Sequence, residues 1–175
     1  MKKPYPIIHV AVIIVIAISM LGFIGCSSLI LSDEPETVEL LQSVFPEAGY
    51  YQYDEEARIY TVYNTGKKKM GYAYITKGAG YSGVITVMVG LEDKETIKGI
   101  YVVSHSDHLG GVGEAAGPPL DFSPWDEQFE GLKIEDCYLA ESDGQVDAIT
   151  EATVSSRKVV DMVRKSALEK IQYIE

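Results

Sequence analysis

The sequence predicts an α+β fold, a largely antiparallel sheet with flanking helices, preceded by one N-terminal transmembrane helix. Three observations support this prediction: an uncharged apolar run at the start, a central series of short segments rich in β-branched and aromatic residues, and an amphipathic segment near the C-terminus. The chain has 175 residues, a length that suits a single domain with a core of its own.

The first element is the apolar run. No Asp, Glu, Lys or Arg lies between Lys3 and Asp33, and residues 7–31 exceed the roughly 20 residues that a helix needs to cross a bilayer. Lysines precede the run and acids follow it, so the positive-inside rule places the N-terminus in the cytoplasm. We expect residues 1–32 to form a cytoplasmic N-terminus and a single-pass anchor in the cell membrane, with residues 7–31 in the lipid bilayer. Residues 33–175 then form one extracytoplasmic domain.

Two other interpretations of the apolar run are open. A cleaved secretory signal has a short apolar core, whereas this run continues to Leu31. A lipoprotein signal would end at Cys26, which follows a glycine. The apolar length favours a retained anchor over both.

Composition excludes several function classes. The formal charge is −11, and omitting the two leading lysines leaves −13 for residues 33–175, so nucleic acid is not an expected partner. Cys26 and Cys137 are too far apart for a CxxC pair or a dense disulfide framework. We expect no iron–sulfur cluster, c-type haem or structural zinc.

The extracytoplasmic part begins with a helix and continues with strands. Ser32 is the expected capping residue of a first helix that ends at Pro46. A final amphipathic helix is expected over 156–171. Eight tyrosines lie between Tyr50 and Tyr81, and we interpret them as strand residues rather than as a stacking surface for a ligand. Short connections indicate hairpins, with strands expected at 58–63, 70–75, 84–91, 97–104, 133–139 and 146–149.

Two segments could hold a ligand. A glycine-rich loop at 105–119 contains two of the three histidines; its glycines allow close approach of a flat ligand, and its histidine spacing does not favour a metal. Residues 147–158 place hydroxyl groups, Arg157 and Lys158 at the start of the last helix, where the helix dipole favours an anion such as phosphate. Residues alone leave open that Thr153, Ser155 or Ser156 is an ordinary N-cap.

The run Asp-x-x-Thr-x-Ala-Thr at 147–153 resembles the signature of the FMN-binding domain family, in which the last threonine is esterified to the phosphate of FMN. The apolar N-terminus, the glycine turn at 78–83, the loop at 105–113 and the segment 122–129 are similar to the G subunit of the Rnf electron-transport complex. They are more distantly similar to the C subunit of the sodium-translocating NADH:quinone reductase. Two departures stand out: Glu151 occupies a position where the family has glycine, and residues 107–113 differ from the family's Glu-Thr-Pro-Gly-Leu-Gly.

The resemblance implies an electron-transfer subunit of an ion-translocating oxidoreductase complex that carries covalent FMN and has no independent turnover. Its partners would be the membrane subunits and a flavin transferase that attaches the cofactor. Two alternatives are a stand-alone anchored flavoprotein and an anchored module without flavin. The resemblance makes Thr153 the attachment point and implies further cofactor contacts at Asp147, Thr150, Ala152, Ser155, Ser156, His105, Leu109, Gly110 and Gly113.

Overall fold

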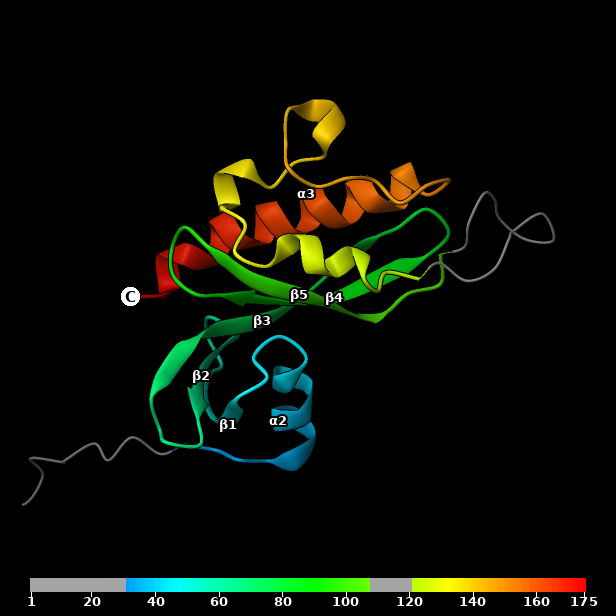
Figure 1. The fold of residues 1–175 in the computed structure, drawn as a ribbon. Coiled ribbons are helices and arrows are strands. Elements are labelled where there is room, and N and C mark those ends of the chain that lie inside the picture. The colour runs from blue at the N-terminus through cyan, green and yellow to red at the C-terminus, as the bar shows by residue number, and fades with distance from the viewer. Residues whose placement is uncertain (1–30, 108–120) are drawn as a thin grey trace, which may run out of the picture. The chain divides into compact units, whose positions relative to one another are not determined.

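A five-stranded antiparallel sheet forms the centre of the fold (Figure 1), in a computed structural model that describes residues 31–107 and 121–175. The strands lie side by side in chain order, and every neighbouring pair is antiparallel. Short connections between consecutive strands make this order the expected one. The strands are β1 (Ala48–Asp54), β2 (Ile59–Asn64), β3 (Lys69–Ala79), β4 (Val84–Leu91) and β5 (Ile97–Ser104).

The two faces of the sheet pack against different helices. Side chains alternate between faces along a strand, so Val87 and Val89 of β4 belong to one apolar cluster and Met88 to the other. The larger cluster lies between the sheet and α3 (Thr153–Lys170), with three short 3₁₀ helices beside it (Figure 1). The smaller cluster is covered by α2 (Pro35–Gln42). The 3₁₀ helices are η2 (Trp125–Phe129), η3 (Ile134–Asp136) and η4 (Ala140–Ser142), and a fourth, η5 (Ile171–Tyr173), follows α3.

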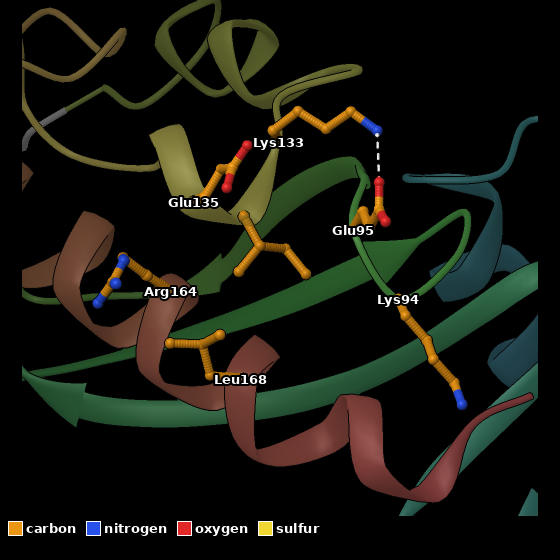
Figure 2. Close-up of a pocket in the computed structure, with 7 residues that line it drawn as sticks. Lys94, Glu95, Lys133, Glu135, Arg164 and Leu168 are labelled. Carbon is orange, nitrogen blue, oxygen red and sulfur yellow. Dashed lines mark hydrogen bonds and ion pairs between the residues drawn. The ribbon is translucent and has the colours of Figure 1, made fainter.

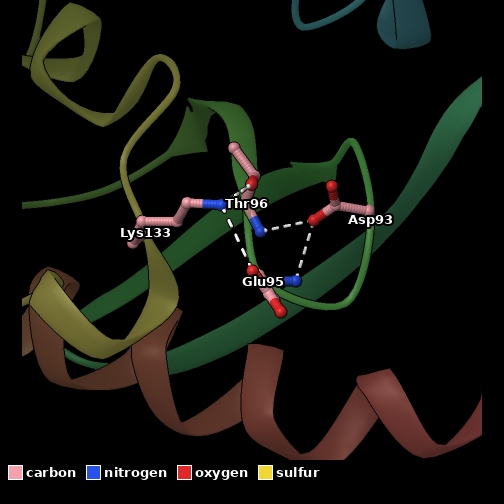
Figure 3. Close-up of polar contacts among 4 residues, drawn as sticks. All are labelled: Asp93, Glu95, Thr96 and Lys133. Atoms are coloured by element: carbon pink, nitrogen blue, oxygen red, sulfur yellow. Dashed lines mark hydrogen bonds and ion pairs between the residues drawn. The ribbon is translucent and has the colours of Figure 1, made fainter.

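The β4–β5 turn is held by polar contacts (Figure 3). Asp93 Oδ1 accepts hydrogen bonds of 2.8 Å from the backbone N–H groups of Glu95 and Thr96. The bond from Glu95 is the main reason that the pKa of Asp93 lies below its ordinary value. Lys133 Nζ donates to Thr96 Oγ1 at 2.9 Å and lies 3.4 Å from a carboxylate oxygen of Glu95. These contacts join the turn to the segment that leads into η3.

The prediction of an α+β fold with a largely antiparallel sheet is confirmed. Four of the expected strands exist, and β1 is a strand that the sequence analysis missed. The strands expected at 133–139 and 146–149 are wrong, because these residues contain η3 and make only isolated bridges. Their apolar side chains, including Ile134, Leu139 and Val146, point into the larger cluster and cover the sheet instead of extending it.

The capping role expected for Ser32 is also wrong. Glu34 is the N-cap of α2, while Ser32 forms a two-bond backbone bridge with Tyr51 at 2.7 and 2.8 Å. Tyr51, Tyr63, Tyr72 and Tyr74 are buried, which supports the interpretation of the tyrosines as strand residues of the core. The proposed anchor at 7–31 lies almost wholly outside the described residues. Within 31–107 and 121–175, no helix has the length and apolar character needed to span a membrane.

Candidate functional site

Helix α3 begins at Thr153, and its N-terminus lacks a side-chain cap among the described residues. The N-cap residue is Ala152. The N-cap alternative for Thr153, Ser155 and Ser156 is therefore wrong: Thr153 is the first helical residue and is partly exposed. The backbone N–H of Ser156 donates to Ala152 O at 3.0 Å, so the three amides before it precede the helical ladder and can meet an anion.

The two serines of this first turn face the protein interior. Ser156 is fully buried; its hydroxyl donates to Ala152 O and accepts from the backbone N–H of Ile149, both at 3.0 Å. Ser155 is 2% exposed, and its hydroxyl donates to Asp107 Oδ2 at 2.6 Å. Both hydroxyl groups therefore form hydrogen bonds inside the protein at the start of α3. Their direct contact with a cofactor remains a prediction.

Asp107 is a fully buried carboxylate that joins three segments. Besides Ser155, it accepts hydrogen bonds from the backbone N–H groups of Tyr81 at 2.8 Å and Ser82 at 2.9 Å, in the turn between β3 and β4. The Ser82 hydroxyl lies 3.1 Å from Asp107 Oδ1. Burial on its own raises the pKa of Asp107, but the hydrogen bonds from Ser155, Tyr81 and Ser82 outweigh it and leave the pKa below its ordinary value.

Close packing at this carboxylate explains one glycine of the β3–β4 turn. A Cβ atom at Gly80 would lie 2.4 Å from Asp107 Oδ2 and 2.7 Å from Oδ1. No side chain fits at that distance, so glycine at position 80 allows the turn to approach Asp107. The glycines make the turn visible in the sequence, but they do not single out Asp107, Tyr81 or Ser82. An acidic residue soon after a strand end was an available signal for Asp107.

The segment before α3 is held by η2. Trp125 Nε1 donates to the backbone oxygen of Asp147 at 2.6 Å, and the backbone N–H of Asp147 donates to Gln128 Oε1 at 2.9 Å. The Asp147 and Thr150 side chains are exposed, and Ala152 is buried. The structure thus brings the candidates at 147–156 together in one corner at the start of α3.

Glu151 adopts a backbone conformation that favours glycine. Its φ angle is +64°, in the left-handed region where a side chain is strained. This is the position at which the signature has glycine, so the departure noted in the sequence coincides with a local conformational cost. The Arg157 guanidinium forms an ion pair with Glu141, so part of the positive charge expected at this helix start is already neutralised.

His105 lies two residues before Asp107. Its ring meets Phe122 edge to face, with centroids 5.1 Å apart, and its buried Nδ1 atom has no hydrogen-bond partner among residues 31–107 and 121–175. The other loop candidates, Leu109, Gly110 and Gly113, lie outside the described residues. No set of three His, Cys, Asp or Glu side chains within 31–107 and 121–175 is arranged to hold a metal ion.

These features coincide with the segment that a known family shares. The model of the FMN-binding domain family matches residues 80–168, from the β3–β4 turn to the last turn of α3. The chain belongs to the FMN-binding domain family. The resemblance inferred from the 147–153 signature is thereby confirmed at the level of the family.

Curated relatives of this FMN-binding domain are components of ion-translocating complexes. It is 29% identical over 139 residues to the G subunit of the ion-translocating oxidoreductase complex of Methanosarcina acetivorans, covering 73% of this chain and 71% of that protein. It is 31% identical over 118 residues to the corresponding G subunit of Escherichia coli K12, covering 65% of this chain and 56% of that protein. The chain thus spans little more than half the length of that bacterial relative. A crystal structure of NqrC from Shewanella oneidensis matches with a TM-score of 0.46 and 19% identity, over 73% of this chain and 70% of that chain.

A cavity of about 300 Å³ lies elsewhere on this FMN-binding domain. Its wall includes Ile134, Arg164 and Leu168, with charged residues around it (Figure 2). Arg164 is eleven residues beyond Thr153, which places it about 16 Å further along the helix axis at 1.5 Å per residue. This cavity is therefore separate from the start of α3, where the signature residues gather.

Proposed function

We propose that this chain is an electron-transfer subunit of an ion-translocating oxidoreductase complex and carries FMN on Thr153 through a phosphoester bond. The observation that carries the proposal is the start of α3: a partly exposed threonine in the last position of the signature opens a helix that no described side chain caps. Membership of the FMN-binding domain family and relatives named as G subunits of such complexes support the redox role.

The residues around Thr153 fit a phosphate. The amides at the helix start and the positive end of the helix dipole stabilise negative charge. The contacts of Asp147 with Trp125 and Gln128 hold the preceding segment in place, and the buried Ser156 hydroxyl fixes the backbone between Ile149 and Ala152. Bound FMN would supply the redox chemistry, accepting electrons and passing them to the next centre.

Attachment needs a donor and a transferase. With FAD as donor, the Thr153 hydroxyl oxygen forms a new bond to the phosphorus of the FMN half, the pyrophosphate bond breaks, and AMP leaves. The hydroxyl proton passes to the transferase or to solvent. No electron is gained or lost in this transfer, so the product is oxidised FMN on Thr153.

We further propose that residues 7–31 anchor the chain in the lipid bilayer, with the N-terminus in the cytoplasm and residues 33–175 outside. Such an anchor would keep the domain beside the other membrane subunits, which are its proposed redox partners. Protease added to intact cells should then digest residues 33–175. Protection of that domain would contradict this orientation.

A second test concerns Cys26. Cys26→Ser should leave membrane association unchanged, because the apolar run is long enough to anchor the chain without a lipid.

The attachment test compares two threonines. Full-length protein made with a flavin transferase and FAD should gain the mass of one FMN less one water, and its denatured band should fluoresce. Thr153→Val, which has nearly the same shape and no hydroxyl, should carry no adduct. Thr76→Val on β3 should load as the parent does. Covalent flavin in Thr153→Val, or none in the parent, would reject the assignment.

A further inference from the structure

Asp107 places a negative charge next to the helix that is proposed to carry the cofactor. The carboxylate is fully buried, and its oxygens face the N–H groups of Tyr81 and Ser82 and the hydroxyl of Ser155. All of these groups donate, so the carboxylate acts only as an acceptor and needs no proton of its own. The geometry therefore describes an ionised group.

The charge of Asp107 has no ionic partner among residues 31–107 and 121–175. None of the four ion pairs in this part of the chain includes it. Neutral donors can hold a buried carboxylate but cannot cancel its charge, so its field extends into the surrounding site. Electrostatic interactions in a partly buried site are also screened less than those at an open surface.

The same oxygen atom, Asp107 Oδ2, binds both the Tyr81 amide and the Ser155 hydroxyl. Ser155 is two residues beyond Thr153 in the first turn of α3. Asp107 is therefore the link that holds the β3–β4 turn, including the half-exposed Tyr81 side chain, against the turn of helix that begins at Thr153.

We propose that Asp107 is a positioning residue of the flavin site, which holds the β3–β4 turn on the first turn of α3 and whose charge lowers the reduction potential of FMN on Thr153. This inference rests on the proposed attachment. Reduction adds negative charge to the flavin, and a fixed anion nearby makes that addition less favourable. Asp107 would thus favour passing electrons onward over retaining them.

The experiment separates the charge of Asp107 from its hydrogen bonds. Asp107→Asn keeps the shape and removes the charge, and it also replaces one acceptor oxygen by an NH2 group that faces donors. The loss of charge should shift the reduction potential of the loaded protein to a more positive value. Ser155→Ala keeps the charge and removes one bond between the turn and α3, so it should slow flavin loading while leaving the potential close to that of the parent. Ser82→Ala is the matched control. It removes a hydroxyl that lies 3.1 Å from Asp107 Oδ1 and 2.9 Å from Ser106 O, but it keeps the two backbone hydrogen bonds to Asp107.

The possible results are distinct. A positive shift of potential in Asp107→Asn alone supports the inference, because a purely structural contribution would change Asp107→Asn and Ser155→Ala in the same way. An unchanged potential in Asp107→Asn, or equal shifts in both variants, would overturn it. If Asp107→Asn does not fold, Ser82→Lys places an ammonium group beside Asp107 from the exposed β3–β4 turn and should shift the potential to a more positive value; no shift would overturn the inference. Failure of the parent to bind flavin would instead reject the proposed attachment.

Discussion

Replacing Glu151 by glycine tests the link between backbone conformation and the proposed cofactor site. Glu151 has a φ of +64° directly before the N-cap of α3. A left-handed conformation costs a residue with a side chain about 1–2 kcal/mol, whereas glycine adopts it without that cost. Glu151→Gly therefore relieves strain at the segment that positions Thr153.

The relief is partly offset in the unfolded chain, because glycine there has more conformational freedom, worth about 0.4–1 kcal/mol. The expected net gain in the free energy of unfolding is about 0.5 kcal/mol, which raises Tm by about 1–2 °C in a domain of this size. Urea and thermal unfolding of the flavin-free protein measure this gain. Flavin loading should be at least as fast as in the parent, since a negative side chain beside the incoming phosphate has been removed.

Lys67→Gly is the control for relief of strain away from α3; it also removes the contact of Lys67 Nζ with the Tyr50 ring, whose centroid is 5.7 Å away. Lys67 has a φ of +60° in the β2–β3 turn, away from α3. It should give a similar change in unfolding free energy with no change in loading rate. A loss of stability of more than about 1 kcal/mol in Glu151→Gly would refute the argument from strain. Slower loading than in the parent would refute the argument about the glycine position of the signature.

Two further changes test the core around the site. Ser156→Ala removes the acceptor for the Ile149 N–H and should lower the free energy of unfolding by about 1–2 kcal/mol, because a partly buried donor loses its partner. A urea midpoint equal to that of the parent would contradict this. Burial raises the pKa of the Cys137 thiol to about 12 from 9.0. Between these two pH values the thiol is neutral in the folded protein and ionised in the unfolded chain. The contribution of Cys137 to stability is then complete below pH 9 and lost as the pH rises toward 12. In a Cys26→Ser background a thiol reagent should not react with the native protein at pH 8, and prompt labelling would contradict this.

Sequence reasoning predicted the local features of the fold and fewer of the long-range ones. The strands near 84–91 and 97–104 and the last helix have strong periodic patterns, and the structure confirms them. The segments near 133–139 and 146–149 contain similar apolar residues but form a cover for the sheet. Tertiary packing decided their conformation, and packing cannot be derived from the pattern of a short segment.

At the candidate site, too, the local features could be predicted from the sequence and the long-range contacts could not. The signature at 147–153 was visible because its residues are adjacent in the sequence. Asp107 and Ser155 are 48 residues apart, and nothing in either local pattern indicates their contact. The positive φ of Glu151 was also hidden, since the sequence showed a departure from glycine but not the backbone conformation that explains it.

The chain order of the sheet has a consequence for the stage of folding at which a cofactor could be attached. The strands are joined by local hairpins and can pair with one another early, whereas α3 comes last in the chain and must dock on a sheet that already exists. The contact between Asp107 and Ser155 is made only when that docking is complete. A chain in which α3 has not yet docked would present Thr153 without the turn that faces it. Attachment of FMN at Thr153 would then mark chains that have finished folding, and a transferase that recognises the assembled corner would leave incomplete chains without cofactor.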